Sequence, residues 1–463
     1  MSPDSVLFIS VFLPLCLAIY WLIPRMKGKN IVLLAASLVF YSFGSLSGLF
    51  ILLGCALVNF LLGLWVGGRR PVMVLGVALN LGLLAFYKYL DFTLSSILGL
   101  PQLQLGLAAP IGISFFTFKS ISYLVDTWRD KETGTRSFWQ LLGYLSFFPQ
   151  VVAGPIARFC DFAPQLQNRS VTVEDAAAGI RRFTVGLAKK LILAGTLGNI
   201  VDTVFQLEGG PGDLRLAWLA AVCYSLQIYF DFSGYSDMAI GLGRAFGFTT
   251  RENFQYPYIA PTLGNFWRRW HISLSSWFKD YLYIPLGGNR KGKARAGLNK
   301  LIVFTLCGIW HGAAWTFLVW GLWHGLFSML ESLHVIPAKK LESSRGMRVL
   351  GRGYTLLVVC LGFVMFRATS LTQGFAVIGT MFAGFRFTDA ATVLLHQLLS
   401  MENLAIIGLS ILFSMPVKDW LGSNKRLSAL LEPASYVGAL VLLVLCIAKL
   451  ASGGFAPFIY GQF

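Results

Sequence analysis

The chain is 463 residues long, and 56% of its residues are hydrophobic while only 13% are charged. Soluble globular proteins carry about 25% charged residues, so this composition excludes a large soluble domain and indicates a membrane-embedded protein. The net charge of +17 is explained by topology rather than by nucleic acid, because Lys and Arg gather in the cytoplasmic loops of membrane proteins.

The first part of the chain predicts a series of membrane-spanning helices. A helix needs about 20 mainly apolar residues to cross the hydrocarbon core. The candidate spans are 5–23, 31–46, 49–66, 72–90 and 108–125. Basic residues follow the first, third and fifth spans, whereas the other two loops contain no Lys or Arg. The positive-inside rule therefore places the N-terminus outside the cytoplasm.

Residues 138–157 predict a segment that enters the membrane and returns. The run is apolar, but it contains Pro149 and the dipeptide Gly154-Pro155, and basic residues follow it. A crossing helix would place those charges outside, whereas a re-entrant segment keeps them in the cytoplasm. Broken backbone at this depth needs protein or water around it, so we expect a packed or wet interior.

A second irregular region covers residues 253–293. It mixes aromatic rings with cations, which is typical of an interfacial or re-entrant segment on the cytoplasmic side. Residues 301–333 would form one helix of about 50 Å, too long for the core, so we expect a break near residues 312–314. The remaining spans are 191–207, 216–232, 353–369, 402–416 and 432–451, and residues 371–400 are expected to form an outer or partly embedded helix.

The sequence thus predicts an all-α polytopic membrane protein with about eleven spans and two re-entrant segments. We expect one membrane domain over residues 1–463. Within it, N-terminal helices (1–125) precede a core with the re-entrant segments and a histidine motif (126–333), and C-terminal helices follow (334–463).

Ionisable groups at membrane depth are functional candidates, because burying one in lipid costs a few kcal/mol or more. His311 is the sharpest candidate, since it lies inside an apolar run between Trp310 and Gly312. A neutral imidazole can exchange a proton near pH 7; the alternative is a packed histidine bonded to a backbone carbonyl. His324 lies 13 residues further on, about 220° around a straight helix and roughly 20 Å along it. The two histidines share a site only if the helix breaks between them.

Two aspartates in the stretch QIYFDFSGYSDMAIGLG (227–243), Asp231 and Asp237, are further candidates. They line a polar channel or belong to a hydrogen-bond network that holds helix ends. Zinc-protease, nucleophile-elbow and P-loop motifs are missing from the sequence. The seven cysteines include no CxxC pair, so they indicate small buried side chains and no metal site is expected.

Long motifs carry a family resemblance. The stretches NFWRRWHISLSSWFKDYLYIPLGGNRKG (265–292), GIWHGAAWTFLVWGLWHG (308–325) and FFPQVVAGPIARF (147–159) resemble the membrane-bound O-acyltransferase superfamily. The likeness is to the branch that contains the membrane subunit of bacterial alginate O-acetylation. It implies about eleven helices around a central tunnel. It also implies that His311 is catalytic, because it matches the family's characteristic histidine, and His324 and His271 match the other motif histidines.

The chemistry that the resemblance implies is acyl transfer from a cytoplasmic thioester to a hydroxyl, with no bound cofactor. Acetyl-CoA or an acetylated carrier protein is the expected donor, and His311 is the base. Trp310 and Asp231 are expected to line the tunnel. Cations suit the anionic donor, although topology explains such charges equally well. The donor-side candidates are Arg268, Arg269, Trp270 and Lys279.

The resemblance also implies where the protein works and with what. We expect a bacterial inner-membrane protein, surrounded by lipid, with an extracytoplasmic SGNH-hydrolase-like partner that modifies a polysaccharide. An alginate-type exopolysaccharide is the expected acceptor, and peptidoglycan is the alternative with the same chemistry. A proton-coupled transporter using the intramembrane Asp and His residues is the alternative of another class. Inverted internal repeats would favour that transporter, and the sequence shows none.

Overall fold

The computed structural model describes residues 2–422 and 425–453, and the regular elements of this part of the chain are helices. They form two compact units: unit 1 is Met1–Val185 with Tyr235–Glu252, and unit 2 is Gly186–Gly234 with Asn253–Phe463. Two long helical stretches pass from one unit into the other, so neither unit is one continuous piece of chain. The grouping of all residues into a single membrane domain stays a prediction.

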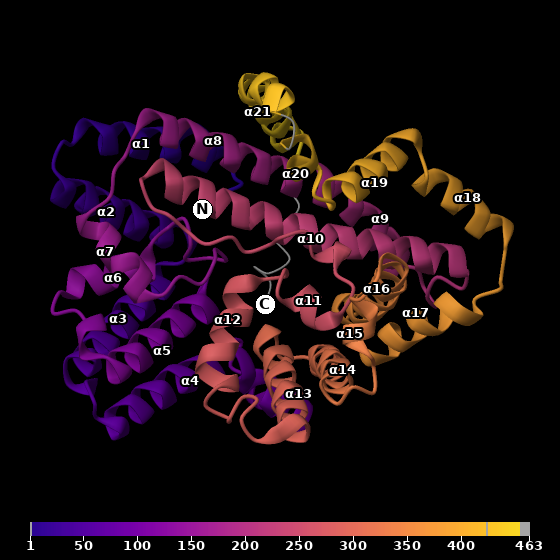
Figure 1. Ribbon diagram of the computed structural model, residues 1–463, viewed down its shortest axis with the longest axis horizontal. Helices are drawn as coiled ribbons and strands as arrows, with labels where there is room; N and C mark the ends of the chain where they lie inside the picture. Colours follow the sequence, from indigo (N-terminus) through magenta and orange to yellow (C-terminus); the bar gives the residue numbers. More distant parts are fainter. Residues whose placement is uncertain (1, 423–424, 454–463) are drawn as a thin grey trace. The chain divides into compact units, whose positions relative to one another are not determined.

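Unit 1 is built mainly from the N-terminal helices, of which α3, α4 and α5 lie side by side (Figure 1). The amides of Asn59 on α3 and Asn80 on α4 are buried and bond reciprocally, at 3.1 and 2.7 Å. Such a pair satisfies polar groups that lipid cannot. The helices of this unit are α1 (Leu13–Leu22), α2 (Met26–Gly44), α3 (Leu46–Val66), α4 (Arg70–Phe92), α5 (Ile113–Arg129), α6 (Phe138–Ser146), α7 (Phe159–Gln167), most of α8 (Val173–Ala188) and the last part of α10 (Leu214–Ala245).

The break predicted around Pro149 is confirmed, because helix α6 ends at Ser146 and α7 begins only at Phe159. The intervening turns pack against the start of α5. Gly112 there has φ 73°, and a Cβ atom on it would lie 2.1 Å from the carbonyl oxygen of Val151. Only glycine fits this contact, so the backbone of the turn packs directly against the start of α5.

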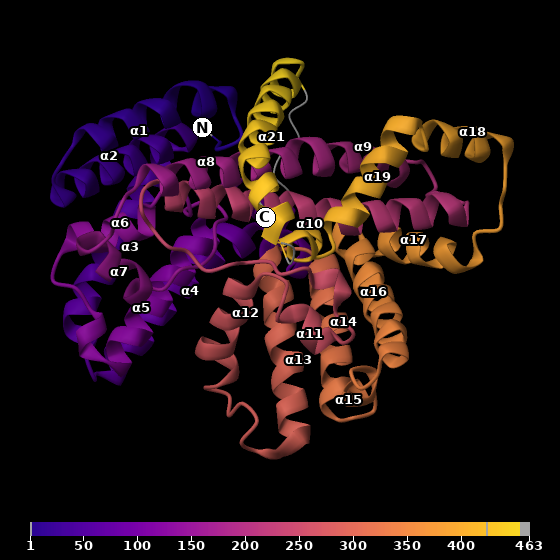
Figure 2. The ribbon, with the colours of Figure 1, turned by 45° about the horizontal axis from the view of Figure 1, so that its top comes forward.

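Unit 2 holds the histidine motif, and three of its helices, α13, α14 and α16, lie side by side (Figure 2). Its helices are α9 (Gly195–Phe205), the first part of α10 (Leu214–Ala245), α11 (Leu263–Trp267), α12 (Ile272–Phe278), α13 (Gly292–His311), α14 (Trp315–Ser332), α15 (Ala338–Leu341), α16 (Arg345–Arg367), α17 (Leu371–Ala383), α18 (Asp389–Leu398), α19 (Met401–Phe413), α20 (Val417–Gly422) and α21 (Lys425–Ala451).

Five helical stretches of the described chain are long and apolar enough to cross a membrane, or six if one bent pair is a single span. They are Leu46–Val66, Arg70–Ile97, Val173–Phe205, Arg345–Arg367 and Leu431–Ala451, and the bent pair is Asp389–Leu398 with Met401–Phe413. The predicted count of about eleven is therefore not confirmed. The other predicted spans lie on helices that do not meet these limits of length and hydropathy, among them the short helices α1 and α5.

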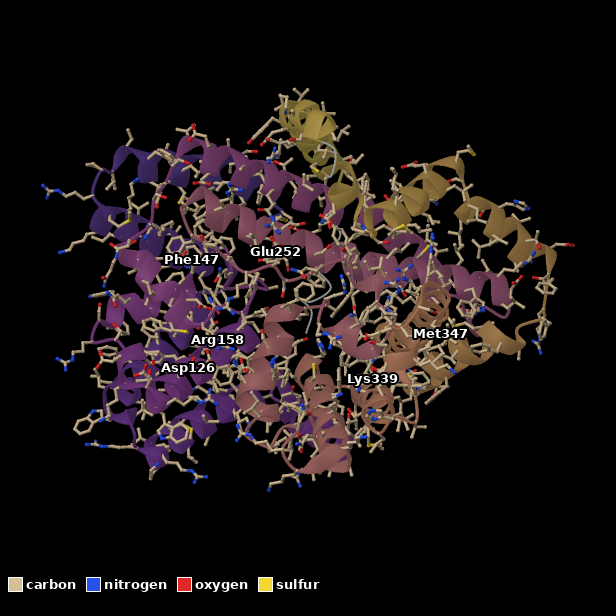
Figure 3. The ribbon with its side chains drawn as sticks, viewed as in Figure 1. Asp126, Phe147, Arg158, Glu252, Lys339 and Met347 are labelled. Atoms are coloured by element: carbon tan, nitrogen blue, oxygen red, sulfur yellow. The ribbon has the colours of Figure 1, made fainter. Side chains whose placement is uncertain are left out.

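The stretch Val173–Phe205 corrects the predicted span 191–207, since it begins well before Leu191. Its early cations had indicated a loop. In unit 1, however, Arg182 donates to Asp237 at 2.9 Å and to Glu252 at 2.7 Å (Glu252 is labelled in Figure 3). Paired charges of this kind are tolerated inside a helical protein, whereas isolated ones are not.

Candidate active site

The site begins with the helical hairpin of α13 and α14 in unit 2. Helix α13 ends at His311 and α14 begins at Trp315, which confirms the break predicted at residues 312–314. The two helices touch through glycines. A Cβ atom on Gly308 would lie 2.3 Å from the carbonyl oxygen of Phe317, and one on Gly321 would lie 2.5 Å from that of Phe304. Gly308 and Gly321, which begin the two Gly-x-Trp-His-Gly stretches of the sequence, thus let the two backbones approach closely.

His311 is the last residue of α13 and is 4% exposed. Its ring packs between aromatic side chains, with ring centroids 4.8 Å from Trp310, 5.0 Å from Trp320 and 5.1 Å from Phe366. Its Nε2 atom lies 3.8 Å from Sγ of Cys307, one helical turn earlier. The imidazole is therefore buried in a cluster of rings, with a thiol beside one nitrogen.

Trp320 joins the two histidines of the motif. Its ring centroid lies 5.0 Å from that of His311 and 5.0 Å from that of His324. His324 is fully buried, and the ring of Trp267 packs against it at 5.0 Å. The break between α13 and α14 thus brings His311 and His324 into one cluster, which a straight helix would forbid.

Several polar atoms of this cluster have no hydrogen-bond partner within the described chain. They are both ring nitrogens of His324 and the indole Nε1 atoms of Trp267 and Trp320. Buried donors and acceptors are nearly always paired in proteins, because leaving one unpaired costs about 1–3 kcal/mol. The cluster therefore has unused hydrogen-bonding capacity next to His311, as a site for a polar reacting group requires.

His271 lies on another segment of unit 2, between α11 and α12. It precedes α12 with φ 43°, is 2% exposed, and its Nδ1 atom lies 3.2 Å from Oδ1 of Asn253. Its ring packs at 4.5 Å against Phe232. Burial lowers the pKa of His271 to about 3, so the ring is neutral at physiological pH. These partners are not among the rings that pack directly against His311 and His324.

The donor-side candidates divide into exposed and anchored residues. Arg268 and Lys279 are exposed. Arg269 is tied down, since it donates to Oδ1 of Asn265 at 2.7 Å and to the carbonyl of Gln255 at 3.0 Å. Trp270 is only 2% exposed and packs among other rings, so it belongs to the core of the segment that carries the arginines.

Of the two predicted tunnel residues, Trp310 lies beside His311, with 6% exposure. Asp231 accepts a hydrogen bond from Nζ of Lys190 at 2.8 Å, and both side chains are buried. This buried ion pair agrees with the alternative prediction for Asp231, a structural network of polar side chains that holds helix ends. A tunnel-lining role for either residue stays a prediction.

Sequence reasoning missed Glu331, which positions the Trp267 segment. Its carboxylate, near the end of α14, accepts from the backbone N–H groups of Leu263 at 2.7 Å and Gly264 at 2.9 Å. These are orphan donors at the start of α11, so Glu331 fixes that helix to α14. Glu331 lies 68 residues after Leu263 and 67 residues after Gly264, so no local sequence pattern reveals the contact.

Trp320 and Cys307 were missed too, although a local signal exists. Trp320 and His324 are four residues apart on α14, and Cys307 and His311 are four residues apart on α13. Residues at this spacing share a helix face, so each was a predictable neighbour of a motif histidine.

The family of this chain is identified by its match to a known protein family. The model of the MBOAT family, the membrane-bound O-acyltransferases, matches residues 83–372, which include all three motif histidines. The chain belongs to the membrane-bound O-acyltransferase family. It is therefore a multi-pass membrane protein and an O-acyltransferase, and the resemblance of the motifs is confirmed.

Relatives of this membrane-bound O-acyltransferase extend along its whole length. It is 37% identical to the probable alginate O-acetylase AlgI of Pseudomonas putida, over 99% of both chains. It is 35% identical to the probable alginate O-acetylase AlgI of Azotobacter vinelandii, again over 99% of both. It is also 34% identical to the peptidoglycan O-acetyltransferase of Helicobacter pylori, over 82% of this chain and 79% of that one.

Proposed function

We propose that the protein takes an acetyl group from a thioester on the cytoplasmic side and passes it to a hydroxyl on the other side, for O-acetylation of an extracytoplasmic polysaccharide. An alginate-type exopolysaccharide is the proposed end acceptor, supported by the full-length likeness to alginate O-acetylases. The observation that carries the proposal is the buried imidazole of His311, held by rings at the end of α13.

His311 acts as the general base in this proposal. A thioester is already activated, so the step that needs help is removal of the proton from a weak hydroxyl nucleophile. A positioned base contributes about 10²–10⁴-fold to such a step. The Nε1–H group of Trp320, packed beside His311, is a donor for the negative charge that develops on the carbonyl oxygen.

Acetyl-CoA is the proposed donor, with an acetylated carrier protein as the alternative, and no cofactor stays bound. Both donors are anionic. The exposed cations of the segments around α12 and α13 suit phosphates: Arg268, Lys279, Arg290, Lys291 and Lys293. Arg269 contributes by holding the segment in place through Asn265 and Gln255.

The location follows from the same proposal. The chain would lie in the bacterial inner membrane with its N-terminus outside and cross about eleven times around a tunnel, with two re-entrant segments. An SGNH-hydrolase-like partner outside would receive the acetyl group and modify the polysaccharide. Peptidoglycan is the second candidate acceptor, favoured by the likeness to the Helicobacter pylori enzyme.

The proposal is tested with purified protein in liposomes and radiolabelled acetyl-CoA. Wild-type protein should release CoA, and His311→Ala should lose roughly 10²–10⁴-fold in rate. His396→Ala, at an exposed histidine at the end of α18, is the matched control and should behave as wild type. Equal rates for His311→Ala and the control would remove His311 from the mechanism, and uptake without thioester consumption would favour a transporter.

A further inference from the structure

We propose that Cys307 carries the acetyl group as a covalent thioester between donor and acceptor, with His311 as its base. This inference rests on the proposed acetyl transfer and adds a second catalytic residue to that site. Cys307 lies on α13, is 7% exposed, and has its Sγ atom 3.8 Å from Nε2 of His311. A thiol beside an imidazole is the pair that nucleophilic catalysis by cysteine uses, and such contacts are often loose before substrate binds.

The imidazole is what separates Cys307 from the other buried cysteines. Burial among apolar side chains disfavours a thiolate, so a buried cysteine is inert unless a base takes its proton. Cys360 on α16 is buried to the same degree, at 8% exposure, but its polar neighbour is the hydroxyl of Ser225. Cys307 therefore has an acceptor for its proton, whereas Cys360 is a matched control without one.

A second observation points to a reacting carbonyl at this place. The ring of Trp320 packs 5.0 Å from that of His311, is 2% exposed, and its Nε1–H group has no acceptor within the described chain. An unused donor in a dry site is suited to the oxyanion of a tetrahedral intermediate. Base, nucleophile and oxyanion donor thus come from α13 and the facing α14.

The chemistry balances in two steps. In the first, Nε2 of His311 takes the Sγ proton as sulfur adds to the acetyl carbonyl of the donor. The donor C–S bond breaks, and the leaving thiolate takes the proton back. In the second, His311 takes the proton of the acceptor hydroxyl as its oxygen attacks acetyl-Cys307, the C–S bond to Sγ breaks, and Sγ recovers the proton. The first step exchanges one thioester for another, so it needs neither ATP nor an oxidant.

A covalent intermediate also explains how two substrates can reach one buried imidazole from opposite sides of the membrane. One imidazole, 4% exposed, serves a donor from one side of the membrane and an acceptor from the other. If the acetyl group waits on Cys307, the donor leaves before the acceptor arrives. The site then takes one substrate at a time, which agrees with the close ring packing around His311.

The test uses the full-length protein in lipid nanodiscs with radiolabelled acetyl-CoA and no acceptor. After acid denaturation, one portion is treated with neutral hydroxylamine and the released label is counted. In an untreated portion, peptide mass spectrometry locates the acetyl group. Wild type and Cys360→Ala should carry label on Cys307, whereas Cys307→Ala and His311→Ala should carry none. Cys307→Ser keeps the shape of the site and should hold the acetyl group as an oxygen ester that neutral hydroxylamine leaves in place.

The outcomes separate this inference from the proposed function. Wild-type protein that releases CoA but shows no acetyl group on Cys307 would overturn the inference and leave the function standing. Turnover of Cys307→Ala equal to that of Cys360→Ala, with equal melting temperatures, would do the same. Wild-type protein that never consumes acetyl-CoA would overturn the proposed acetyl-CoA-dependent function together with the inference.

Discussion

Replacing Gly308 by alanine should damage the hairpin that holds His311. The added methyl group would lie 2.3 Å from the carbonyl oxygen of Phe317 and 3.0 Å from Cα of Gly321. Both are backbone atoms, which cannot rotate away. Reaching even a 3.0 Å separation requires α13 and α14 to move apart by about 0.7 Å.

The expected magnitude follows from this displacement. Overpacking of a well-packed core costs about 1–3 kcal/mol, and a shift of about 1 Å in a catalytic group can cost about 10²-fold in rate. The control is Gly353→Ala on α16, where a Cβ atom meets nothing within 4 Å. Because alanine favours helix over glycine, the control should be neutral or more stable by up to about 1 kcal/mol.

Both variants are compared by thermal unfolding in one detergent and by the rate of CoA release. Gly308→Ala should melt lower and turn over more slowly than wild type, while Gly353→Ala should do neither. If the two variants melt together and are equally active, the close approach of α13 and α14 is wrong.

Three further variants probe other parts of the molecule. Asn59→Leu removes the amide partner of the buried Asn80, which keeps only weaker or local bonds such as that to the carbonyl of Gly76, and should cost about 1–3 kcal/mol. The double variant with Asn80→Leu should largely restore this loss; additive losses in chemical denaturation would argue against the pair. Hydrogen bonds from Arg215 lower the pKa of Asp213 below its usual 3.8, so the folded state gains stability above that pH and loses it as the pH falls through the lowered pKa. The melting-temperature gap between wild type and Asp213→Asn should therefore persist from pH 7 to about 5 and shrink below about 4; a gap that does not change with pH would contradict this. Trp320→Phe removes the N–H donor, together with part of the ring volume, from the ring cluster and should lower kcat by about 10²-fold with little change in KM; an unchanged kcat would exclude the oxyanion role.

The histidine hairpin was predictable because its signals are local. Residues 301–333 are too long for one crossing helix, and the glycine next to His311 marks where the helix stops. The structure ends α13 at His311 and starts α14 at Trp315. The turn after α6 was predictable for the same reason, since Pro149 and Gly154-Pro155 disfavour the continuation of a helix.

The extent of the helix around Lys190 was not predictable, because its charges are balanced by distant residues. Arg182 and Lys190 look like loop residues when counted by hydropathy. Asp237 and Glu252 pair with Arg182, and Asp231 pairs with Lys190, from sequence positions far along the chain. Single-sequence patterns carry no record of such partners, so the predicted span began too late.

The candidate site also combines features that have a local sequence signal with features that depend on distant residues. The position of His311 in an apolar run made it a candidate, and the family resemblance supplied its predicted catalytic role; its neighbours at helical spacing were within reach of the same local reasoning. The contact of Trp267 with His324 depends on how α11 docks against α14, through the carboxylate of Glu331. Docking between helices that are far apart in sequence comes from tertiary packing alone.

The most direct test of the account follows one acetyl group across the membrane. Inverted bacterial membrane vesicles, whose outer face is the former cytoplasmic face, receive radiolabelled acetyl-CoA and carry polysaccharide in their interior. The account predicts alkali-labile acetyl esters on the interior polysaccharide with wild-type protein, and none above background with His311→Gln at equal protein level. Equal labelling by the two proteins would contradict it.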